Sequence, residues 1–219
     1  MPPYTLPSPR DVDKATLLIA HKVTQTPVKT SSRLNDFATT NAMGRSLKLF
    51  FKCENYQKTG SFKYRGASHF LAKLQNHELS RGVVAYSTGT SCSRLTHTLL
   101  TNPSGNHAQA VAHAAQIASR EHRFHIPAYV VVPSNCPPKK ISAAKAYNAT
   151  VFLSGHAPED RIALAKQIQS STGAILVPPA DHADIVLGQA TAIREFLTQV
   201  ADLDAVSYTH LTLPTKRIV

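Results

Sequence analysis

The sequence predicts an α/β fold in which a parallel sheet is covered by helices on both faces, a three-layer αβα arrangement. Short, continuous apolar runs of the kind that form buried strands alternate with segments whose apolar residues recur at helical spacing. Such alternation is typical of parallel sheets, because their strands are connected by helices. Folds of this kind bind ligands beyond the carboxyl ends of the strands, so we expect a site in the loops that follow the strands.

The first third of the chain is predicted to contain three helices and one strand. The first helix covers residues 11–23 and has Asp11 as its N-cap. A second, short helix begins at residues 30–32 and continues through Phe37. Residues 47–53 form a compact apolar and basic run that favours a strand. The loop after this strand enters a helix whose buried positions are Ala67, Phe70, Leu71 and Leu74.

The remainder of the chain supplies the alternating pattern. The expected strands are residues 82–86, 127–133, 149–154 and 174–177. The expected helices are an alanine-rich one that starts at Ser104 or Gly105, and residues 139–147, 158–171 and 184–200. The buried positions expected in these last three helices are Ile141 and Ala144, then Ile162, Ala165 and Ile168, then Ile185, Leu187, Ile193 and Leu197.

Composition limits the possible functions. The net charge of +11 and the pI near 9.8 suggest nucleic-acid binding, because basic surfaces bind phosphate backbones. However, the charges are scattered and form no basic stripe interleaved with aromatic residues, so no specific nucleic-acid partner is expected. The three cysteines are far apart, which argues against disulfides and structural zinc. No long apolar run exists and the first ten residues are proline-rich, so we expect a cytoplasmic protein without a membrane partner.

Lys63 lies where a polar, glycine-containing loop gives way to helical periodicity. A lysine at such a junction can be held at the wall of a cleft with its amine partly desolvated. Desolvation lowers the pKa of the amine and makes it a nucleophile towards aldehydes.

A family resemblance is carried by the segment Ser61-Phe62-Lys63-Tyr64-Arg65-Gly66, which follows Glu54 and Gln57-Lys58-Thr59-Gly60. This segment closely resembles the pyridoxal-phosphate lysine segment of the fold type II enzymes, in the branch of serine racemases and serine/threonine dehydratases. The cysteine synthase branch has Val-Lys-Asp-Arg where this chain has Phe-Lys-Tyr-Arg. The resemblance implies a tryptophan synthase β-like fold and a Schiff base between Lys63 and pyridoxal 5′-phosphate, with Phe62 also at the cofactor.

The segment Ser104-Gly105-Asn106-His107 resembles the second cofactor segment of the same family. By that resemblance Asn106 binds the ring hydroxyl of the cofactor, and Ser104 reaches the substrate α-carbon. Helix starts offer unpaired backbone N–H groups, so an anion site is plausible here on physical grounds as well. We expect His107 and His113 to cap or pack, because neither has a carboxylate partner in the pattern.

The chain departs from the family pattern at residues 90–105. In the family the strand runs directly into the Gly-Asn-His helix start, and excising these residues joins Gly89 to Asn106 in a normal short loop. We hypothesise that the insertion is a retained intron, in which case Thr88 takes the place of Ser104. The alternative is a genuine loop.

The second departure is the stretch 207–219, which does not resemble the family. There the family continues into a glycine-rich loop that binds the cofactor phosphate, whereas no glycine follows Gly188 in this chain. The expected domains are therefore the N-terminal part of a large domain, residues 1–81 and 179–206, and a small αβα domain, residues 82–178. The chain is expected to be a truncated, inactive fragment.

The resemblance implies that the parent protein racemises L-serine or L-threonine, or converts it by β-elimination of water to a 2-oxo acid and ammonia. Lys63 would serve one face of the α-carbon, and Thr88 or Ser104 the other. The parent is expected to be a homodimer that acts on a small-molecule amino acid. A non-catalytic αβ fragment and a basic binding module remain as alternatives.

Some residues match the nucleotide-effector site of serine racemases, which implies ATP and a divalent cation as effectors of the parent protein. No metal ligand is expected in this chain. The matching residues are Ser31, Ser32, Lys58, Thr59, Gln109 and Tyr147.

Overall fold

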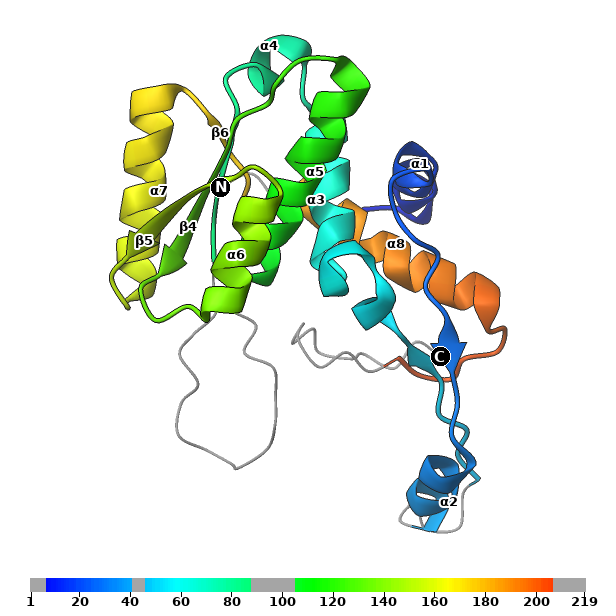
Figure 1. Ribbon diagram of the computed structural model, residues 1–219. Coiled ribbons are helices and arrows are strands. Elements are labelled where there is room, and N and C mark those ends of the chain that lie inside the picture. Colours follow the sequence, from blue (N-terminus) through cyan, green and yellow to red (C-terminus); the bar gives the residue numbers. More distant parts are fainter. Residues whose placement is uncertain (1–6, 41–45, 88–104, 207–219) are drawn as a thin grey trace.

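The computed structural model describes residues 7–40, 46–87 and 105–206 (Figure 1). In chain order, its elements are α1 (Pro9–Ile19), β1 (Val28–Lys29), α2 (Ser32–Thr40), β2 (Phe51–Lys52), the 3-10 turns η1 (Glu54–Tyr56) and η2 (Lys58–Gly60), α3 (Lys63–Lys73), α4 (Asn76–Leu79), β3 (Val83–Tyr86), α5 (Asn106–His122), β4 (Ala128–Pro133), α6 (Pro138–Ala146), β5 (Thr150–Ser154), α7 (Pro158–Thr172), β6 (Ile175–Leu176) and α8 (Ala183–Gln199).

The main sheet has four strands in the order β5-β4-β3-β6. All of its pairings are parallel; Val83, for example, lies between Ala128 of β4 and Ile175 of β6. The predicted parallel sheet is therefore confirmed. All of its strands were expected within a few residues, because parallel strands buried on both faces have continuous apolar sequences.

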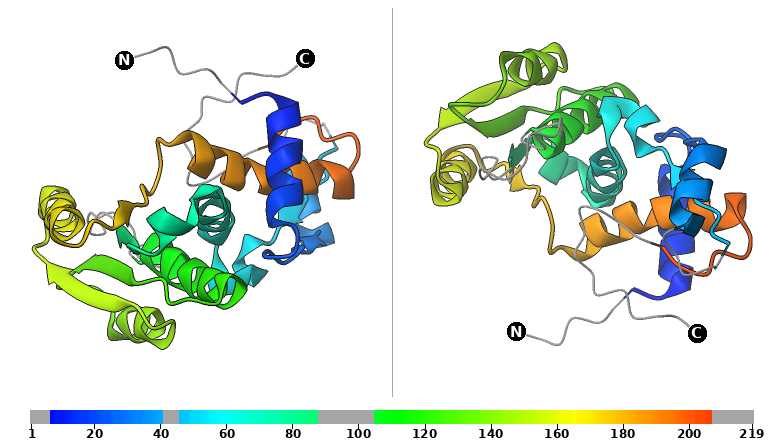
Figure 2. Two further views of the ribbon diagram at one scale, coloured as in Figure 1. Left: turned by 90° about the horizontal axis from the view of Figure 1, so that it is seen from above. Right: turned by 90° about the horizontal axis from the view of Figure 1, so that it is seen from below.

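The two faces of the sheet are covered by different helices. Successive strand residues point to opposite faces, so Val83 and Ala85 join the cluster beneath α5, whereas Val84 packs with Ala165 and Ile168 of α7. Figure 2 shows α7 on one side of the sheet and α5 and α6 on the other. The three-layer αβα arrangement is confirmed.

Helix α3 lies on the outer side of α5 and is crossed by α8. Tyr64 and Phe70 of α3 belong to the same apolar cluster as Val111 of α5. At the crossing with α8 the backbones come very close: a Cβ atom on Gly188 would lie 2.6 Å from the Cα of Gly66. The absence of a side chain at this point sets the spacing of the two helices.

We expect the substitution Gly188→Ala to destabilise the fold by about 1–3 kcal/mol, the usual cost of overpacking. The added methyl group would also lie 2.7 Å from the carbonyl oxygen of Arg65, and backbone cannot move aside as a flexible side chain can. Helix propensity alone predicts the opposite sign, because alanine stabilises a helix interior by about 1 kcal/mol relative to glycine. The midpoint of thermal unfolding distinguishes the two, and an increase would contradict the close crossing.

Helix α1 begins two residues before the expected start at residue 11, so the prediction that Asp11 is the N-cap was wrong. Ser8 is the cap, and its hydroxyl accepts a hydrogen bond from the backbone N–H of Asp11 at 3.3 Å. The Asp11 carboxylate accepts in return from the Ser8 backbone N–H at 3.1 Å. This reciprocal capping box places Pro9 in the first turn, where its missing N–H costs nothing.

The strand expected at residues 47–53 is reduced to β2, which pairs antiparallel with β1 over two residues. The buried face of α8 also differs from expectation. Leu197 was expected to be buried but is 47% exposed, and Leu187 and Ile193 are half-buried. The small or aromatic residues Gly188, Thr191, Ala192 and Phe196 are buried instead, because α8 lies so close to α3 that small side chains fill much of the contact.

The apolar cluster extends across both predicted domains: Tyr64 and Ile185 from residues 1–81 and 179–206 pack in it with Val111 and Val130 from residues 82–178. The division into domains remains a prediction. Among the described helices, none combines the length and the apolar character that crossing a bilayer requires.

Candidate functional site

The candidate site lies at the carboxyl-terminal edge of the parallel sheet. The Nζ atom of Lys63 donates a hydrogen bond to the carbonyl oxygen of Pro179 at 2.8 Å, just after β6. His107, in the first turn of α5, is bonded to the carbonyl oxygen of Val177 at 3.0 Å. Ser87, which follows β3, accepts from the backbone N–H of Gly105 at 2.7 Å. These contacts gather the segments after β3 and β6 and the starts of α3 and α5, as the fold class predicts.

Lys63 is the first residue of α3, and its loop is held rigidly in place. The side chain of Gln57 bonds to Thr24 in both directions, at 2.9 and 2.7 Å, and Lys58 donates to the carbonyl oxygen of Lys22 at 2.6 Å. Thr59 and Gly60 then adopt left-handed φ values of 67° and 71°, which turn the chain into the helix. The predicted position of Lys63 at a loop-to-helix junction is confirmed.

The Lys63 amine is partly withdrawn from water. Its pKa is lowered below the ordinary lysine value because burial disfavours the charged form. The Nζ atom lies 5.2 Å from the centroid of the Phe62 ring, so that ring is part of its apolar surroundings. A less protonated amine is a better nucleophile towards a carbonyl carbon, which is the chemistry expected from the sequence.

The start of α5 supplies the opposite wall of the site. Gly105 has a left-handed φ of 100°, and a Cβ atom there would meet the Lys140 side chain at 3.2 Å. The next residue, Asn106, lies in the first turn, and its Oδ1 accepts a hydrogen bond from Lys140 Nζ at 3.4 Å. The glycine thus permits the close approach of α6 that brings a second lysine to the helix start.

His107 is buried beside this wall and is uncharged at neutral pH. Its pKa is lowered to about 4, mainly by burial and further by the positive charge of Lys63. Because a carbonyl oxygen faces Nε2, that nitrogen carries the proton. The expectation that His107 packs rather than catalyses agrees with these contacts, since its partner is a backbone carbonyl and not a carboxylate.

We expect stability to fall as the pH decreases from about 6.5 to about 4, because the unfolded chain then binds a proton that the folded His107 rejects. The full loss from this residue is about 3 kcal/mol, because its pKa falls from the ordinary value of 6.5 to about 4. The variant His107→Gln keeps an N–H donor but does not titrate, so its urea unfolding should depend less on pH. The pKa values of His69 and His113 are also lowered by burial, which leaves a residual slope. Identical slopes for wild type and variant would contradict the prediction.

A buried ion network holds the loop and α3 to the rest of the molecule. Arg65 is 1% exposed and donates two hydrogen bonds of 2.8 Å to the Glu54 carboxylate and two of 3.1 Å to that of Glu195. Lys52 also pairs with Glu195. Burial alone would raise the pKa of Glu195, but hydrogen bonds from Arg65 and Lys52 outweigh it and lower the pKa. The network connects η1, α3, β2 and α8 two residues from Lys63.

The six residues matched to a nucleotide-effector site fall into two groups. Lys58 and Tyr147 are joined through rings: Lys58 Nζ lies 5.9 Å from the Tyr64 ring, which lies 5.0 Å from His113, and His113 lies 4.5 Å from Tyr147. Thr59 lies beside Lys58 in η2, and Gln109 is one turn before His113 on α5.

Ser31 and Ser32 belong to the other group, at the start of α2, which projects away from α5 and α6 (Figure 1). The structure therefore brings four of the six matched residues into one neighbourhood. Thr88 and Ser104, the two candidates for the second proton-transfer residue, lie outside the described residues. So do the stretch 207–219 and all of the proposed insertion except Gly105.

Three partners of the site were not predicted from the sequence. The carbonyl oxygen of Pro179 has no residue-type signature, because any residue could supply it. The sequence pattern gives Ser87 and Lys140 no distinguishing signal, because their positions beside Gly105 and Asn106 depend on how the helices pack. No group of three or more His, Cys, Asp or Glu side chains that could hold a metal ion occurs among the described residues.

The donor set fits the aldehyde and ring end of pyridoxal phosphate. Lys63 offers a desolvated amine and Asn106 an amide at a helix start. Ser61 offers a hydroxyl that is buried and has no hydrogen-bond partner within the described part of the chain. The phosphate end is different, because the sequence contains no cluster of glycines whose backbone could cradle a phosphate.

Comparison with known proteins agrees with this chemistry. The family model described as pyridoxal-phosphate dependent enzyme matches residues 19–212. The chain is 35% identical over 201 residues to the L-threo-3-hydroxyaspartate ammonia-lyase of Saccharomyces cerevisiae, and 36% identical over 202 residues to the serine racemase of Schizosaccharomyces pombe. Each alignment covers 92% of this chain and 53% of the relative.

The structure is similar to the crystal structure of serine racemase from Dictyostelium discoideum, with a TM-score of 0.71 and 35% identity over 89% of this chain and 54% of the other. The chain thus spans about half the length of the relatives it matches. Because the family model covers most of its residues, the chain belongs to the fold type II family of pyridoxal-phosphate-dependent enzymes.

Proposed function

We propose that the protein of which this chain forms part racemises a small 3-hydroxy amino acid, L-serine or L-threonine, or converts it by β-elimination of water, followed by hydrolysis of the resulting imine, to a 2-oxo acid and ammonia. The observation that carries the proposal is the desolvated amine of Lys63 at the carboxyl edge of the sheet, where substrates of such folds bind. The similarity to serine racemases and to L-threo-3-hydroxyaspartate ammonia-lyases supports the substrate class.

The residues divide the work as follows. Pyridoxal phosphate, when bound, supplies an electron sink for the negative charge that develops on the substrate α-carbon. Lys63 would hold the cofactor, and its amine would take the α-proton on one face of the substrate. The hydroxyl of Thr88 or Ser104 serves the other face, which permits racemisation. Asn106 orients the ring, and the Arg65 network holds the loop that carries Lys63.

The test is an assay of the complete protein encoded by the mature transcript, with pyruvate and D-serine measured from L-serine and 2-oxobutyrate from L-threonine. We expect turnover on the order of 1 per second or more from that protein. The 219-residue chain alone should show none, because it has no glycine cluster for the cofactor phosphate. Inactivity of the complete protein on both amino acids would refute the proposal. Full activity of the 219-residue chain would refute the claim that a glycine cluster is needed to hold the cofactor phosphate. Sequencing of the transcript across the codons for residues 89–105 decides whether Thr88 or Ser104 is the second proton-transfer residue.

We also propose that ATP, with a divalent cation, is an effector of the complete protein. The proximity of Lys58, Thr59, Gln109 and Tyr147 supports a shared site, although Ser31 and Ser32 lie apart from them. The complete protein is proposed to be a cytoplasmic homodimer, and an exposed apolar residue such as Leu17, which is 77% exposed, could take part in such contacts. Sedimentation of the complete protein with and without ATP tests whether it is a dimer and whether ATP acts on it.

A further inference from the structure

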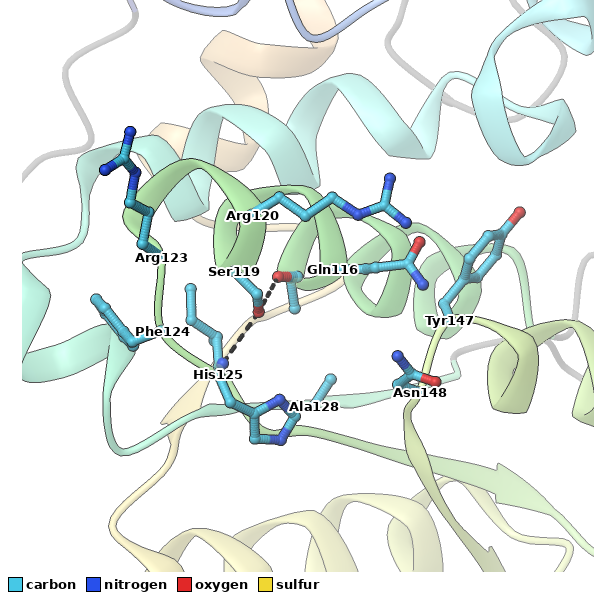
Figure 3. A pocket seen from close by; sticks show the side chains of 11 residues that line it. Gln116, Ser119, Arg120, Arg123, Phe124, His125, Ala128, Tyr147 and Asn148 are labelled. Carbon is cyan, nitrogen blue, oxygen red and sulfur yellow. Dashed lines mark hydrogen bonds between the residues drawn. The ribbon is translucent and has the colours of Figure 1, made fainter.

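A pocket with a cavity volume of about 320 Å³ lies beside the end of α5 and the starts of β4 and β5 (Figure 3). It is lined by the last two turns of α5, the loop into β4 and the loop before β5. These loops lie at the amino ends of the strands, whereas Lys63 lies at the carboxyl ends. The pocket is therefore separate from the candidate active site. Its volume is at the lower end of the range for small-molecule sites.

The charged side chains that line this pocket, Arg120 and Arg123, are both basic. No aspartate or glutamate lines it. All acidic side chains of the sequence fall within the described ranges, and there neither arginine forms an ion pair with any of them. The neighbouring carboxylate of Glu121 instead pairs with Lys22 and with His21. The positive charge is thus available to a ligand.

The uncharged lining has a polar part and an apolar part. Figure 3 shows the side chains of Gln116, Tyr147 and Asn148 together at one side of the pocket. Each of them carries at least one hydrogen-bond donor. The hydroxyl of Ser119 is already engaged, because it donates to Ala115 and accepts from the backbone N–H of Ile126. Phe124, Ile126 and Ala128 contribute apolar surface. This composition suits a ligand with an anionic head and an apolar body.

Two residues of the rim have unusual backbone conformations. Arg123 has a φ of 59° at the C-cap of α5, and Asn148 has a φ of 61° before β5. Glycine adopts such angles without steric cost, whereas arginine does so only against resistance from its side chain. An arginine at the end of a helix also compensates the helix dipole, but this role requires neither a cavity nor the two amide side chains. The strained arginine beside a basic cavity therefore points to a ligand.

We propose that this pocket binds a small organic anion, with a carboxylate or phosphate head held by Arg120 and Arg123 and a compact apolar body against Phe124 and Ile126. The site is distinct from the proposed nucleotide-effector residues, of which only Tyr147 lines it. Charge-assisted hydrogen bonds to guanidinium groups would supply most of the affinity.

The test is isothermal titration of the complete protein with phenyl phosphate, benzoate, inorganic phosphate and the neutral analogue benzamide. We expect at least one of the two aromatic anions to bind, benzamide not to bind, and the tighter of the two to identify the head group. Arg120→Gln and Arg123→Gly should each weaken binding about tenfold or more, the loss expected for one charge-assisted contact. Arg123→Gly should also raise the thermal midpoint, because glycine removes the strain.

The control variant Arg10→Gln removes the same charge from an exposed position on α1 and should leave the affinity unchanged. Lys63→Ala should also leave it unchanged, which separates this site from the cofactor site. Unfolding curves verify that each variant is folded. The proposal is overturned if no anion binds at millimolar concentration, if benzamide binds equally well, or if the affinity survives both arginine substitutions.

Discussion

Replacing Lys63 with alanine is expected to abolish covalent attachment of pyridoxal phosphate to the protein. The amine is the group that would form the imine bond, and its lowered pKa leaves a larger nucleophilic fraction at neutral pH than an exposed lysine has. After incubation with the cofactor and reduction by borohydride, peptide mass spectrometry of the wild type should locate the pyridoxyl group on Lys63. The same treatment of Lys63→Ala should give no modified site at comparable yield.

The matched control is Lys73→Ala, which removes an exposed lysine at the other end of the same helix. It should leave the labelling of Lys63 unchanged. Lys63→Arg is a second useful variant, because it retains a positive charge but its guanidinium does not condense with aldehydes. Labelling spread evenly over several surface lysines of the wild type would show that the Lys63 amine has no special reactivity.

The second large effect is expected from Arg65→Ala, which should destabilise the fold by about 3–5 kcal/mol, the usual cost of breaking a buried ion pair from one side. Removal of the guanidinium leaves the carboxylates of Glu54 and Glu195 facing each other with side chains only 11% and 13% exposed. A domain is commonly stable by only about 5–15 kcal/mol, so the variant should unfold at a much lower urea concentration.

Two further variants separate charge from geometry. Arg65→Lys keeps the charge but cannot reach both carboxylates with a planar fork, so it should lose part of the stability. The double variant Arg65→Met and Glu54→Gln removes the carboxylate that loses its ion-pair partner, while Glu195 keeps its pairing with Lys52, and it should recover part of what Arg65→Ala loses. If the free energy of unfolding of Arg65→Ala lies within about 1 kcal/mol of the wild-type value, the network contributes no more to stability than a surface ion pair does.

The residues of the sheet and of the lysine loop were accessible from sequence because their patterns are local. Val130, Val131 and Val132 are buried on both faces of the sheet, and a strand buried in this way has an uninterrupted apolar sequence. Lys63 was placed correctly because the change from glycine and polar residues to helical periodicity occurs within a few residues. The capping box of Ser8 and Asp11 is also local, and the pattern of a serine followed three residues later by a carboxylate could have revealed it.

By itself, then, the sequence determined the alternating α/β pattern and the junction at which Lys63 enters a helix. Only the tertiary structure decided what surrounds that lysine: its amine meets the carbonyl oxygen of Pro179, 116 residues away, and the loop before it is tied to Glu195 of α8 through Arg65. It also decided that Leu197 is exposed while small residues of α8 are buried. These outcomes depend on how closely α3 and α8 cross at Gly66 and Gly188, and that distance is set by packing between residues far apart in the chain.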